Sequence, residues 1–417
     1  MSKDNSNFFK KKNEWSAIKD KLLSCYLTPY FQKVLLTGKP ICYVDCFAGK
    51  GKFEDGTEGS PLIALKAREN CLMLTKISNK RGALRTIFIE LNHAIDLSSN
   101  VGAVHPSYDK PVIISGAYED NIEALLSQER GNNVFLYIDP YGIKALDSSL
   151  LRKFKTMGFH SFEMLINFNS FGFFRDACRV LNVDYRTDEA LQGLDDLVEY
   201  EPTLVSSDKE SEDLLSAIAG GDYWKDIVLD YKTGKLDGYK AEQRLSTEYK
   251  QQFKKDYEYV LDMPIRLKAG QRPKYRMIHV CDHEDGCFLM AQNMQKRKDE
   301  LFISIQQDNQ ISIFDVAPDY SSTAEGELLS SNQVAEMVSE CLDSFSGEVC
   351  ITKFVAAFVN RYGLICNFKM IYSILDEMQK KSQVEIRREP PYTEKHRLST
   401  FWEENKGHSV FVRKVRK

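Results

Sequence analysis

Residues 41–51 read Ile-Cys-Tyr-Val-Asp-Cys-Phe-Ala-Gly-Lys-Gly, and this stretch decides the predicted fold. The apolar run Ile41–Cys46 predicts a short buried strand with an acid, Asp45, near its end. Gly49 and Gly51 follow in a turn, where the missing Cβ atoms let the backbone approach a ligand. A buried strand that leads through an acid into a Gly-x-Gly turn is typical of the carboxyl edge of an open α/β sheet, where cofactors bind.

The turn leads into a predicted helix, because Ser60 suits the N-cap and Pro61 the first helical position. A nicotinamide dinucleotide is the first alternative for such a site. However, Glu54 stands where the dinucleotide fingerprint has its third glycine, and a loop over 52–59 separates the turn from the helix. Both features favour S-adenosylmethionine (SAM) as the cofactor. A glycine-rich structural turn without a ligand is the other alternative.

Further strands and helices alternate along the chain, which predicts a mainly parallel sheet covered on both faces. The other predicted strands are Thr86–Glu90, Val112–Ser115, Val134–Asp139, Glu163–Phe168 and Tyr275–Cys281, and the helices are Pro61–Cys71, Asp120–Gln128 and Cys287–Lys298. Residues 175–262 are highly charged with helical spacing and predict a helical insertion. A strand pair is expected at Leu301–Gln306 and Ile311–Phe314.

The predicted fold class is therefore α/β: a Rossmann-like class I methyltransferase sheet over 41–316, with a helical insertion. Residues 1–40 precede it as an N-terminal helical segment, whose helix over 14–36 should kink or restart at Pro29. A linker rich in Ser, Glu, Asp and Gly follows the sheet domain. Residues 331–417 show three helical patterns and then two strand-like pieces, which is the order of a winged-helix-like α+β domain.

The fourth predicted strand carries a second motif, Asp139-Pro140-Tyr141-Gly142. Amino methyltransferases have (Asp/Asn)-Pro-Pro-(Tyr/Phe) here, and the carboxylate accepts hydrogen bonds from the target NH2 while the ring stacks on the base. The second proline is absent, and the motif looks like the Asp-Pro-Phe-Gly of tRNA guanine-N2 methyltransferases. Asp139, Pro140 and Tyr141 are the predicted catalytic residues, and a plain strand-to-loop turn is the alternative.

Other residues extend the predicted site. Glu90 ends the second strand, where a carboxylate can accept both ribose hydroxyls. Phe171 and Arg175 follow the fifth strand and are candidates to stack on and clamp a base, with packing against the insertion as the alternative. The predicted cofactor-binding residues are Asp45, Phe47, Ala48, Gly49, Gly51, Ser60, Glu90, Gly116 and Asp120.

Other classes of site find little support. Four residues near one predicted strand have metal-binding side chains, but their spacing matches no common structural zinc pattern, and no metal is predicted: His279, Cys281, His283 and Cys287. There is no Gly-x-Ser-x-Gly elbow of an α/β-hydrolase. There is also no Gly-Lys-Ser/Thr phosphate loop, which argues against an NTPase.

The composition is that of an ordinary globular protein, with 43% hydrophobic residues, 28% charged residues and a net charge of −4. Ten cysteines without a repeating framework indicate reduced thiols, and no signal peptide or membrane span is evident, so a cytoplasmic location without membrane contact is expected. Positive charge gathers over 380–417, with eleven Lys or Arg against five Glu. Phosphate contacts are therefore expected from this end of the chain.

Five motifs together resemble those of the three-Cys-motif partner family, TcmP: Asp45-Cys46-Phe47-Ala48-Gly49, Phe53-Glu54-Asp55-Gly56, Gly59-Ser60-Pro61-Leu62, Ile138-Asp139-Pro140-Tyr141-Gly142 and His283-Glu284-Asp285-Gly286. The resemblance runs from the N-terminal helix to about residue 300. It implies a class I SAM-dependent methyltransferase-like fold in a bacterial protein. It also implies a partner, because such genes are typically found beside a radical-SAM-like protein with a three-Cys motif.

One position departs from the expected pattern. After the third strand, an acid should directly follow Gly116 and pair with the adenine amine of SAM, but Ala117 stands there. Glu119 or Asp120 could substitute, or the backbone alone could bind the adenine. This departure weakens the expected affinity for SAM.

The leading functional prediction is a SAM-dependent methyltransferase that modifies an exocyclic amine of a nucleic-acid base, either RNA or DNA. The alternative is a catalytically inactive methyltransferase-like adaptor that acts with the radical-SAM-like partner protein. A third possibility is a methyltransferase for a protein or small molecule, which would hold if the C-terminal domain only dimerises.

Overall fold

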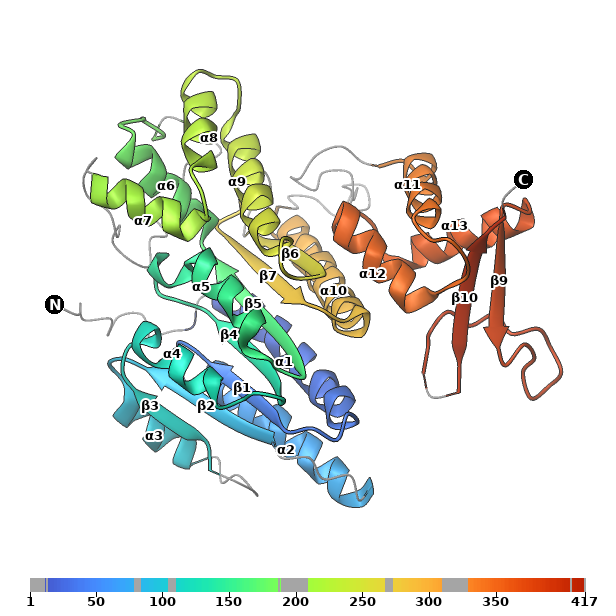
Figure 1. The fold of residues 1–417 in the computed structure, drawn as a ribbon, viewed down its shortest axis with the longest axis horizontal. Coiled ribbons are helices and arrows are strands. Elements are labelled where there is room, and N and C mark those ends of the chain that lie inside the picture. Colours follow the sequence, from blue (N-terminus) through green and yellow to red (C-terminus); the bar gives the residue numbers. More distant parts are fainter. Residues whose placement is uncertain are drawn as a thin grey trace.

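The computed structural model describes residues 12, 14–78, 84–103, 110–186, 188, 209–266, 273–309, 329–405 and 407–415. A seven-stranded sheet lies at its centre, in the order β3-β2-β1-β4-β5-β7-β6 (Figure 1). The strands are β1 Ile41–Asp45, β2 Leu84–Glu90, β3 Val112–Ser115, β4 Asn133–Ile138, β5 Ser161–Phe168, β6 Tyr259–Ile265 and β7 Tyr275–Cys281. Strands β1 to β5 are parallel, and β7 runs antiparallel to both β5 and β6. This mainly parallel, Rossmann-like sheet confirms the predicted α/β fold class.

Both faces of the sheet are buried under helices. Successive strand residues point to opposite faces, so neighbouring residues of one strand belong to different halves of the core. In β1, Ile41 and Tyr43 pack on one face and Cys42 and Val44 on the other. The first face is covered by α1 Glu14–Leu35, α2 Ser60–Ser78, α3 Ala94–Gly102 and α10 Glu284–Asn309. The second is covered by α4 Tyr118–Ser127, α5 Ser148–Lys153, α6 Ser170–Val180, α7 Lys209–Ala219, α8 Tyr223–Lys232 and α9 Gly238–Phe253. Near-continuous apolar strands are the consequence of this two-sided cover.

Helix α1 runs through Pro29 as one helix, so the chain does not restart there, and the kink stays a prediction. One local prediction about the sheet domain was wrong. Leu301–Gln306 belongs to α10 and not to a strand, because no Gly or Pro separates it from the helical pattern before it. Strand β6 begins at Tyr259, close to the predicted end of the helical insertion at about 262, and is the edge strand of the sheet. The partner strand Ile311–Phe314 lies outside the described residues.

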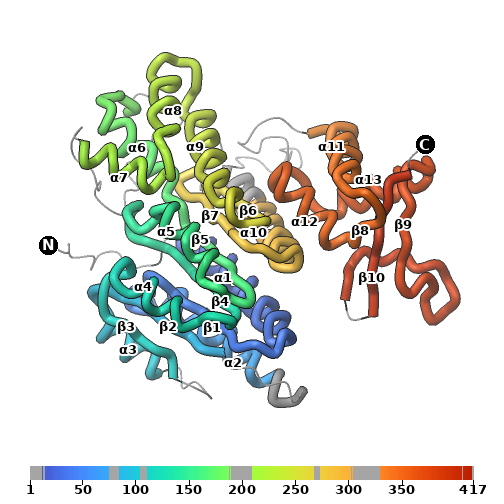
Figure 2. Tube along the Cα trace, viewed as in Figure 1, coloured from blue at the N-terminus to red at the C-terminus, as the bar shows by residue number. Residues whose placement is uncertain are grey.

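The C-terminal part has the element order that the sequence predicted, with one added short strand. Its elements are α11 Ser331–Asp343, β8 Val349–Cys350, α12 Ile351–Tyr362, α13 Phe368–Lys380, β9 Val384–Glu389 and β10 Ser409–Lys414. The three strands form an antiparallel sheet in the order β8-β10-β9. Helix α12 packs against α10 of the sheet domain, while β9 and β10 lie on the far side (Figure 2). The winged-helix assignment and the domain boundaries stay predictions.

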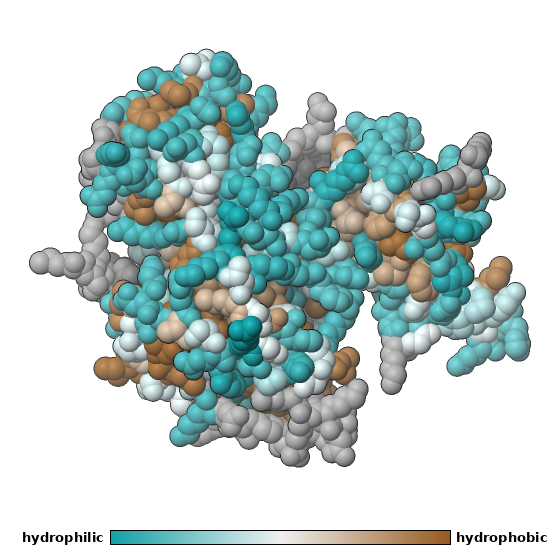
Figure 3. Space-filling model, in the orientation of Figure 1, coloured by the Kyte–Doolittle hydropathy of each residue, from teal (hydrophilic) through white to brown (hydrophobic). Residues whose placement is uncertain are grey.

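The surface shown in Figure 3 is mainly hydrophilic, with apolar patches near α3 and β3. Exposed apolar side chains of this region are Leu91, Ile95 and Val112, of which Ile95 is 88% exposed. Within the described ranges, no helix is both long enough and apolar enough to cross a membrane.

Candidate functional site

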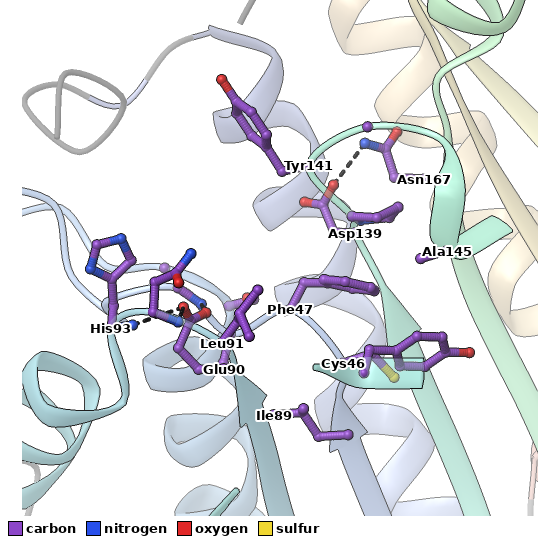
Figure 4. A pocket seen from close by; sticks show the side chains of 18 of the residues that line it. Cys46, Phe47, Ile89, Glu90, Leu91, His93, Asp139, Tyr141, Ala145 and Asn167 are labelled. Carbon is purple, nitrogen blue, oxygen red and sulfur yellow. Dashed lines mark hydrogen bonds between the residues drawn. The ribbon is translucent and has the colours of Figure 1, made fainter. Parts of the chain in front are cut away.

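A cavity of about 460 Å³ lies at the carboxyl edge of the sheet. Its walls come from the segments that follow β1 to β5, from the first residue of β7 and from α1 (Figure 4). Ten of the twelve residues predicted for the cofactor or for catalysis line this cavity, and Asp45 and Asp120 do not. Those that line the cavity are Phe47, Ala48, Gly49, Gly51, Ser60, Glu90, Gly116, Asp139, Pro140 and Tyr141.

The glycine turn after β1 has the backbone geometry that the sequence required. Gly49 and Gly51 have φ angles of 60° and 74°, which favour glycine. A Cβ atom on Gly51 would lie 2.9 Å from Leu97 Cδ1, so this position is also sterically closed to larger residues. Helix α2 begins at Ser60, but the Ile63 amide donates to the Gly59 carbonyl (3.2 Å). Gly59 is therefore the capping residue, one position before the predicted cap.

Glu90 ties this turn to the end of β2. Its Oε2 accepts a hydrogen bond from the Gly49 amide (2.8 Å), and its Oε1 accepts from the amides of Asn92 (2.8 Å) and His93 (3.0 Å). A carboxylate offers about four acceptor sites, so one remains for a ligand hydroxyl. The side chain is only 9% exposed and lines the cavity. Glu90 is thus placed both to hold the turn and to accept a hydrogen bond from a ligand.

Asp45 lies beneath the cavity and does not line it. Its Oδ1 accepts from the Phe47 amide (3.2 Å), and within the described ranges its Oδ2 has no hydrogen-bond partner. Burial raises the pKa of Asp45 to about 7, although the Ser60 hydroxyl and the Phe47 amide favour the ionised form. Asp45 therefore supports the turn from below, and its predicted cofactor role would have to act through that turn.

The segment after β3 contains both acids that could replace an acid at Ala117, and only one of them faces the cavity. Gly116, Ala117, Tyr118 and Glu119 line it, and Asp120 does not. The Tyr118 ring packs against Phe47 across the cavity wall, with ring centroids 5.1 Å apart. Of the two acids that the sequence offered in place of Ala117, Glu119 is the one at the cavity. The predicted role of Asp120 stays a prediction without support from its position.

Asp139 carries the densest set of polar contacts in the cavity. The ammonium of Lys19, from α1, lies 2.8 Å from each carboxylate oxygen. The Asn167 amide donates to Oδ1 (2.7 Å), a contact visible in Figure 4, and the Tyr137 hydroxyl donates to Oδ2 (3.3 Å). Lys19 is 6% exposed, and its ammonium also lies 5.2 Å from the Tyr275 ring centroid.

A second acid, Asp20 of α1, lies near the ion pair of Lys19 and Asp139. Asp20 lines the cavity and forms an ion pair with Lys12. Burial raises the pKa of Asp20 to about 6, and the charge of Asp139 adds to the increase, while Lys12 and Lys19 oppose it. The cavity therefore combines several acids with Lys19 of α1, and Lys12 pairs with one of these acids, Asp20.

The sequence analysis did not predict that α1 contributes residues to the cavity, although the pattern of the helix contains a signal for Lys19. Apolar Trp15, Leu22, Leu23 and Tyr26 form the buried face of the helix, and Lys19 falls on the same face by its spacing. A lysine on a buried helical face needs a partner, which is the signal that could have identified it. Other cavity residues that were not predicted include Ser16, Asp20, Asn92, His93, Lys144, Asn167, Asn169 and Tyr275.

Phe171 and Arg175 do not lie at the cavity. Both are 2% exposed in α6, and the Arg175 guanidinium lies 5.7 Å from the Phe171 ring centroid. Their positions fit the packing role that the sequence left open as the alternative. Substrate binding by these two residues stays a prediction that their burial does not favour.

The His and Cys residues of the β7 region do not converge. His279 Nε2 lies 2.9 Å from Glu163 Oε2, and Tyr26 donates its hydroxyl hydrogen to the same oxygen. Cys281 and Cys287 are buried, whereas the His283 side chain is 67% exposed. Within the described part of the chain, no group of three His, Cys, Asp or Glu side chains is placed to hold a metal ion. Of the four residues, His279 contributes to the packing of α1 against the sheet, through Glu163 and Tyr26.

No family model matches this chain, so membership of the TcmP family stays a prediction. No curated protein matches it either. Among solved structures, the chain is similar to the plantazolicin methyltransferase BamL, in a crystal structure with a triazolic desmethylPZN analog and SAH. The identity is 11%, the TM-score is 0.28, and the similarity covers 66% of this chain and 89% of that chain. A likeness this distant carries no argument about function.

Proposed function

We propose that the chain is a SAM-dependent methyltransferase that binds SAM in the cavity at the carboxyl edge of its sheet. The observation that carries the proposal is the position of Glu90 and Asp139 on two sides of the β1 glycine turn, all facing one cavity. Cofactors of open α/β folds bind at this edge, and the glycine turn allows close approach of the backbone.

The residues present fit such a ligand. Glu90 keeps an acceptor site for a ribose hydroxyl, as its three amide contacts leave one of about four positions open. Leu91 lines the cavity with its side chain 56% exposed, which leaves apolar surface for an adenine ring to cover. Glu119 is the acid available to an exocyclic adenine amine. Bound SAM would supply the methyl group that is transferred.

For the acceptor, we propose an exocyclic amine of a nucleic-acid base. Asp139 would orient the amine by accepting its hydrogen bonds, and Tyr141, which lines the cavity and is 45% exposed, would stack on the base. An exposed or flipped nucleotide is needed to reach a cavity of this kind.

The C-terminal basic residues support this acceptor less than their number suggests. Four of them form ion pairs within the described part of the chain: Arg387 with Glu348 and Glu389, Arg388 with Asp376, Arg413 with Glu385, and Lys414 with Asp343. Three of these acids, Glu348, Asp376 and Asp343, lie outside 380–417. The residues left for phosphate contacts include Lys380, Lys381, Lys395 and Arg397. Binding to nucleic acid should therefore depend on salt with a modest slope.

A second candidate function is a catalytically inactive adaptor that acts with a radical-SAM-like partner protein. The observation that favours it is the occupied state of Asp139, whose carboxylate is fully engaged by Lys19, Asn167 and Tyr137. SAM binding without methyl transfer to any acceptor would favour this candidate.

Calorimetric titration with SAM tests the cofactor site with a matched pair of variants. Glu119→Gln and Asp120→Asn each remove one exposed carboxylate from neighbouring positions, but only Glu119 lines the cavity. We expect Glu119→Gln to weaken SAM binding about 3- to 10-fold, as for one lost hydrogen bond, and Asp120→Asn to leave it unchanged. Equal effects of the two substitutions, or no binding by the wild type, would contradict the proposal.

A further inference from the structure

Lys19 is built into the wall of the cavity. It lies on the buried face of α1, and its ammonium reaches Asp139, 120 residues away in the sequence, with a distance of 2.8 Å to both oxygens. The Tyr275 ring lies on another side of the same ammonium, 5.2 Å from centroid to nitrogen. A carboxylate and an aromatic ring around one nitrogen are typical of a site for an ammonium group.

The contacts of Asp139 leave no room for a second amine. Oδ1 accepts from Lys19 and Asn167, and Oδ2 accepts from Lys19 and Tyr137. These four hydrogen bonds use the capacity of a carboxylate. Asn167 and Tyr137 are buried residues of β5 and β4, held by the sheet, whereas Lys19 reaches Asp139 through a flexible four-carbon stem. Lys19 is thus the partner that can leave.

We propose that Lys19 fills the acceptor-amine subsite from within, and that a substrate amine enters only by displacing its ammonium. This inference rests on the proposed function for its catalytic meaning. The subsite itself is an alkylammonium site formed by Asp139, Asn167, Tyr137 and Tyr275. The displaced ammonium keeps its charge and needs a new anion, which a phosphate next to the substrate amine would supply. Lys19 would in this way favour phosphate-bearing acceptors over free bases.

A binding experiment tests the subsite without SAM. In Lys19→Ala the removed atoms correspond to n-propylamine, so n-propylammonium should fill the space and pair with Asp139. We expect n-propylammonium chloride to raise the Tm of the full-length Lys19→Ala chain by about 2 °C or more in a saturable way. Potassium chloride and tetramethylammonium chloride at equal ionic strength should not, because neither cation donates an N–H hydrogen bond.

Wild type and the double variant Lys19→Ala/Asp139→Asn are the controls. In both proteins n-propylammonium should raise the Tm no more than potassium chloride does. In the wild type Lys19 already fills the subsite, and in the double variant the carboxylate of Asp139 is missing. Equal stabilisation by tetramethylammonium, or the same response in the double variant, overturns the proposal. So does a Lys19→Ala chain that folds and shows no response.

Kinetics provide a second measurement with Lys19→Met, which keeps the packing of the stem if Lys19→Ala does not fold. The assay is methyl transfer from tritiated SAM to a pool of short single-stranded RNA and DNA oligonucleotides. We expect Lys19→Met to lower KM about 10-fold with little change in kcat, because an internal competitor is lost. A lower kcat at unchanged KM would indicate a merely structural lysine and overturn the proposal. If wild type neither binds SAM nor transfers methyl groups, the proposed function fails, while the propylammonium titration still decides this inference.

Discussion

Two groups of buried polar residues lie along the same sheet, and they differ in what surrounds them. The cluster of Tyr26, Glu163 and His279 packs between α1 and the sheet, where Glu163 Oε2 is the shared partner of the Tyr26 hydroxyl and of His279 Nε2. The acids at the carboxyl edge, among them Glu90 and Asp139, face a cavity and are held by backbone amides and a lysine. Burial of ionisable groups therefore does not by itself identify a site. A cavity and a displaceable partner distinguish the carboxyl edge.

The largest effect should come from the buried cluster. Glu163→Ala removes the shared acceptor of Tyr26 and His279 and leaves both polar groups buried without it. We expect a loss of about 3–5 kcal/mol in the free energy of unfolding, measured by urea denaturation. Affinity for SAM, measured where the variant is still folded, should stay within about 2-fold of the wild type. A weakened SAM site with little loss of stability would reverse the roles assigned to the two regions.

The pH dependence of stability should report the carboxyl edge. Asp45 and Asp20 have pKa values raised to about 7 and about 6, so the folded chain binds protons that the unfolded chain releases. Their contribution is fully present below about pH 4 and is lost as the pH rises through 6 to 7. We expect the free energy of unfolding to fall by several kcal/mol between pH 4 and pH 8 through these groups, at about 1.4 kcal/mol for each unit by which a pKa is raised.

Asp45→Asn is the matched variant for this measurement, because it keeps the size of the side chain and removes the titration. Its stability should change less with pH than that of the wild type. An identical pH profile in both proteins would show that Asp45 is ionised at neutral pH like an ordinary aspartate.

The glycine turn allows a finer comparison. Gly51 and Gly56 both have positive φ angles, of 74° and 89°, so an alanine costs similar backbone strain at either position. Only at Gly51 would the new Cβ meet a neighbour, Leu97 at 2.9 Å, whereas at Gly56 nothing lies within 4 Å. We expect Gly51→Ala to lose about 1–3 kcal/mol of stability and Gly56→Ala about 1 kcal/mol, by thermal unfolding. Equal losses would mean that the Leu97 side chain moves aside without cost.

The smallest expected effect is a change in SAM affinity, which should differ between substitutions of two exposed apolar residues near the cavity. Leu91 lines it and Ile95 does not, although both are more than half exposed. Leu91→Ala should weaken SAM binding about 5- to 10-fold, since apolar contact with the ligand is lost. Ile95→Ala should leave the dissociation constant unchanged. A similar loss of SAM affinity in both variants would show that SAM does not bind at the proposed position beside Leu91.

Local sequence patterns were sufficient for most of the elements and for most strand ends, but they missed α3, α5 and β6. The apolar run before Asp45 and the run before Asp139 predicted buried strands, and the acids at their ends then had to lie at one edge of a parallel sheet. Errors arose where a local pattern fits two structures, as for Leu301–Gln306, which is apolar enough for a strand but continues a helix. The short β8 gave no pattern of its own.

The sequence alone thus determined the α/β fold, the glycine turn and the acids that follow the strands, because alternation, turn chemistry and burial are encoded locally. Only the tertiary structure decided which groups meet. It brought Lys19 of α1 to Asp139, placed Glu119 and not Asp120 at the cavity, and buried Phe171 and Arg175 in α6. Periodicity tells which face of an element is buried, but the partner on that face depends on how distant elements pack.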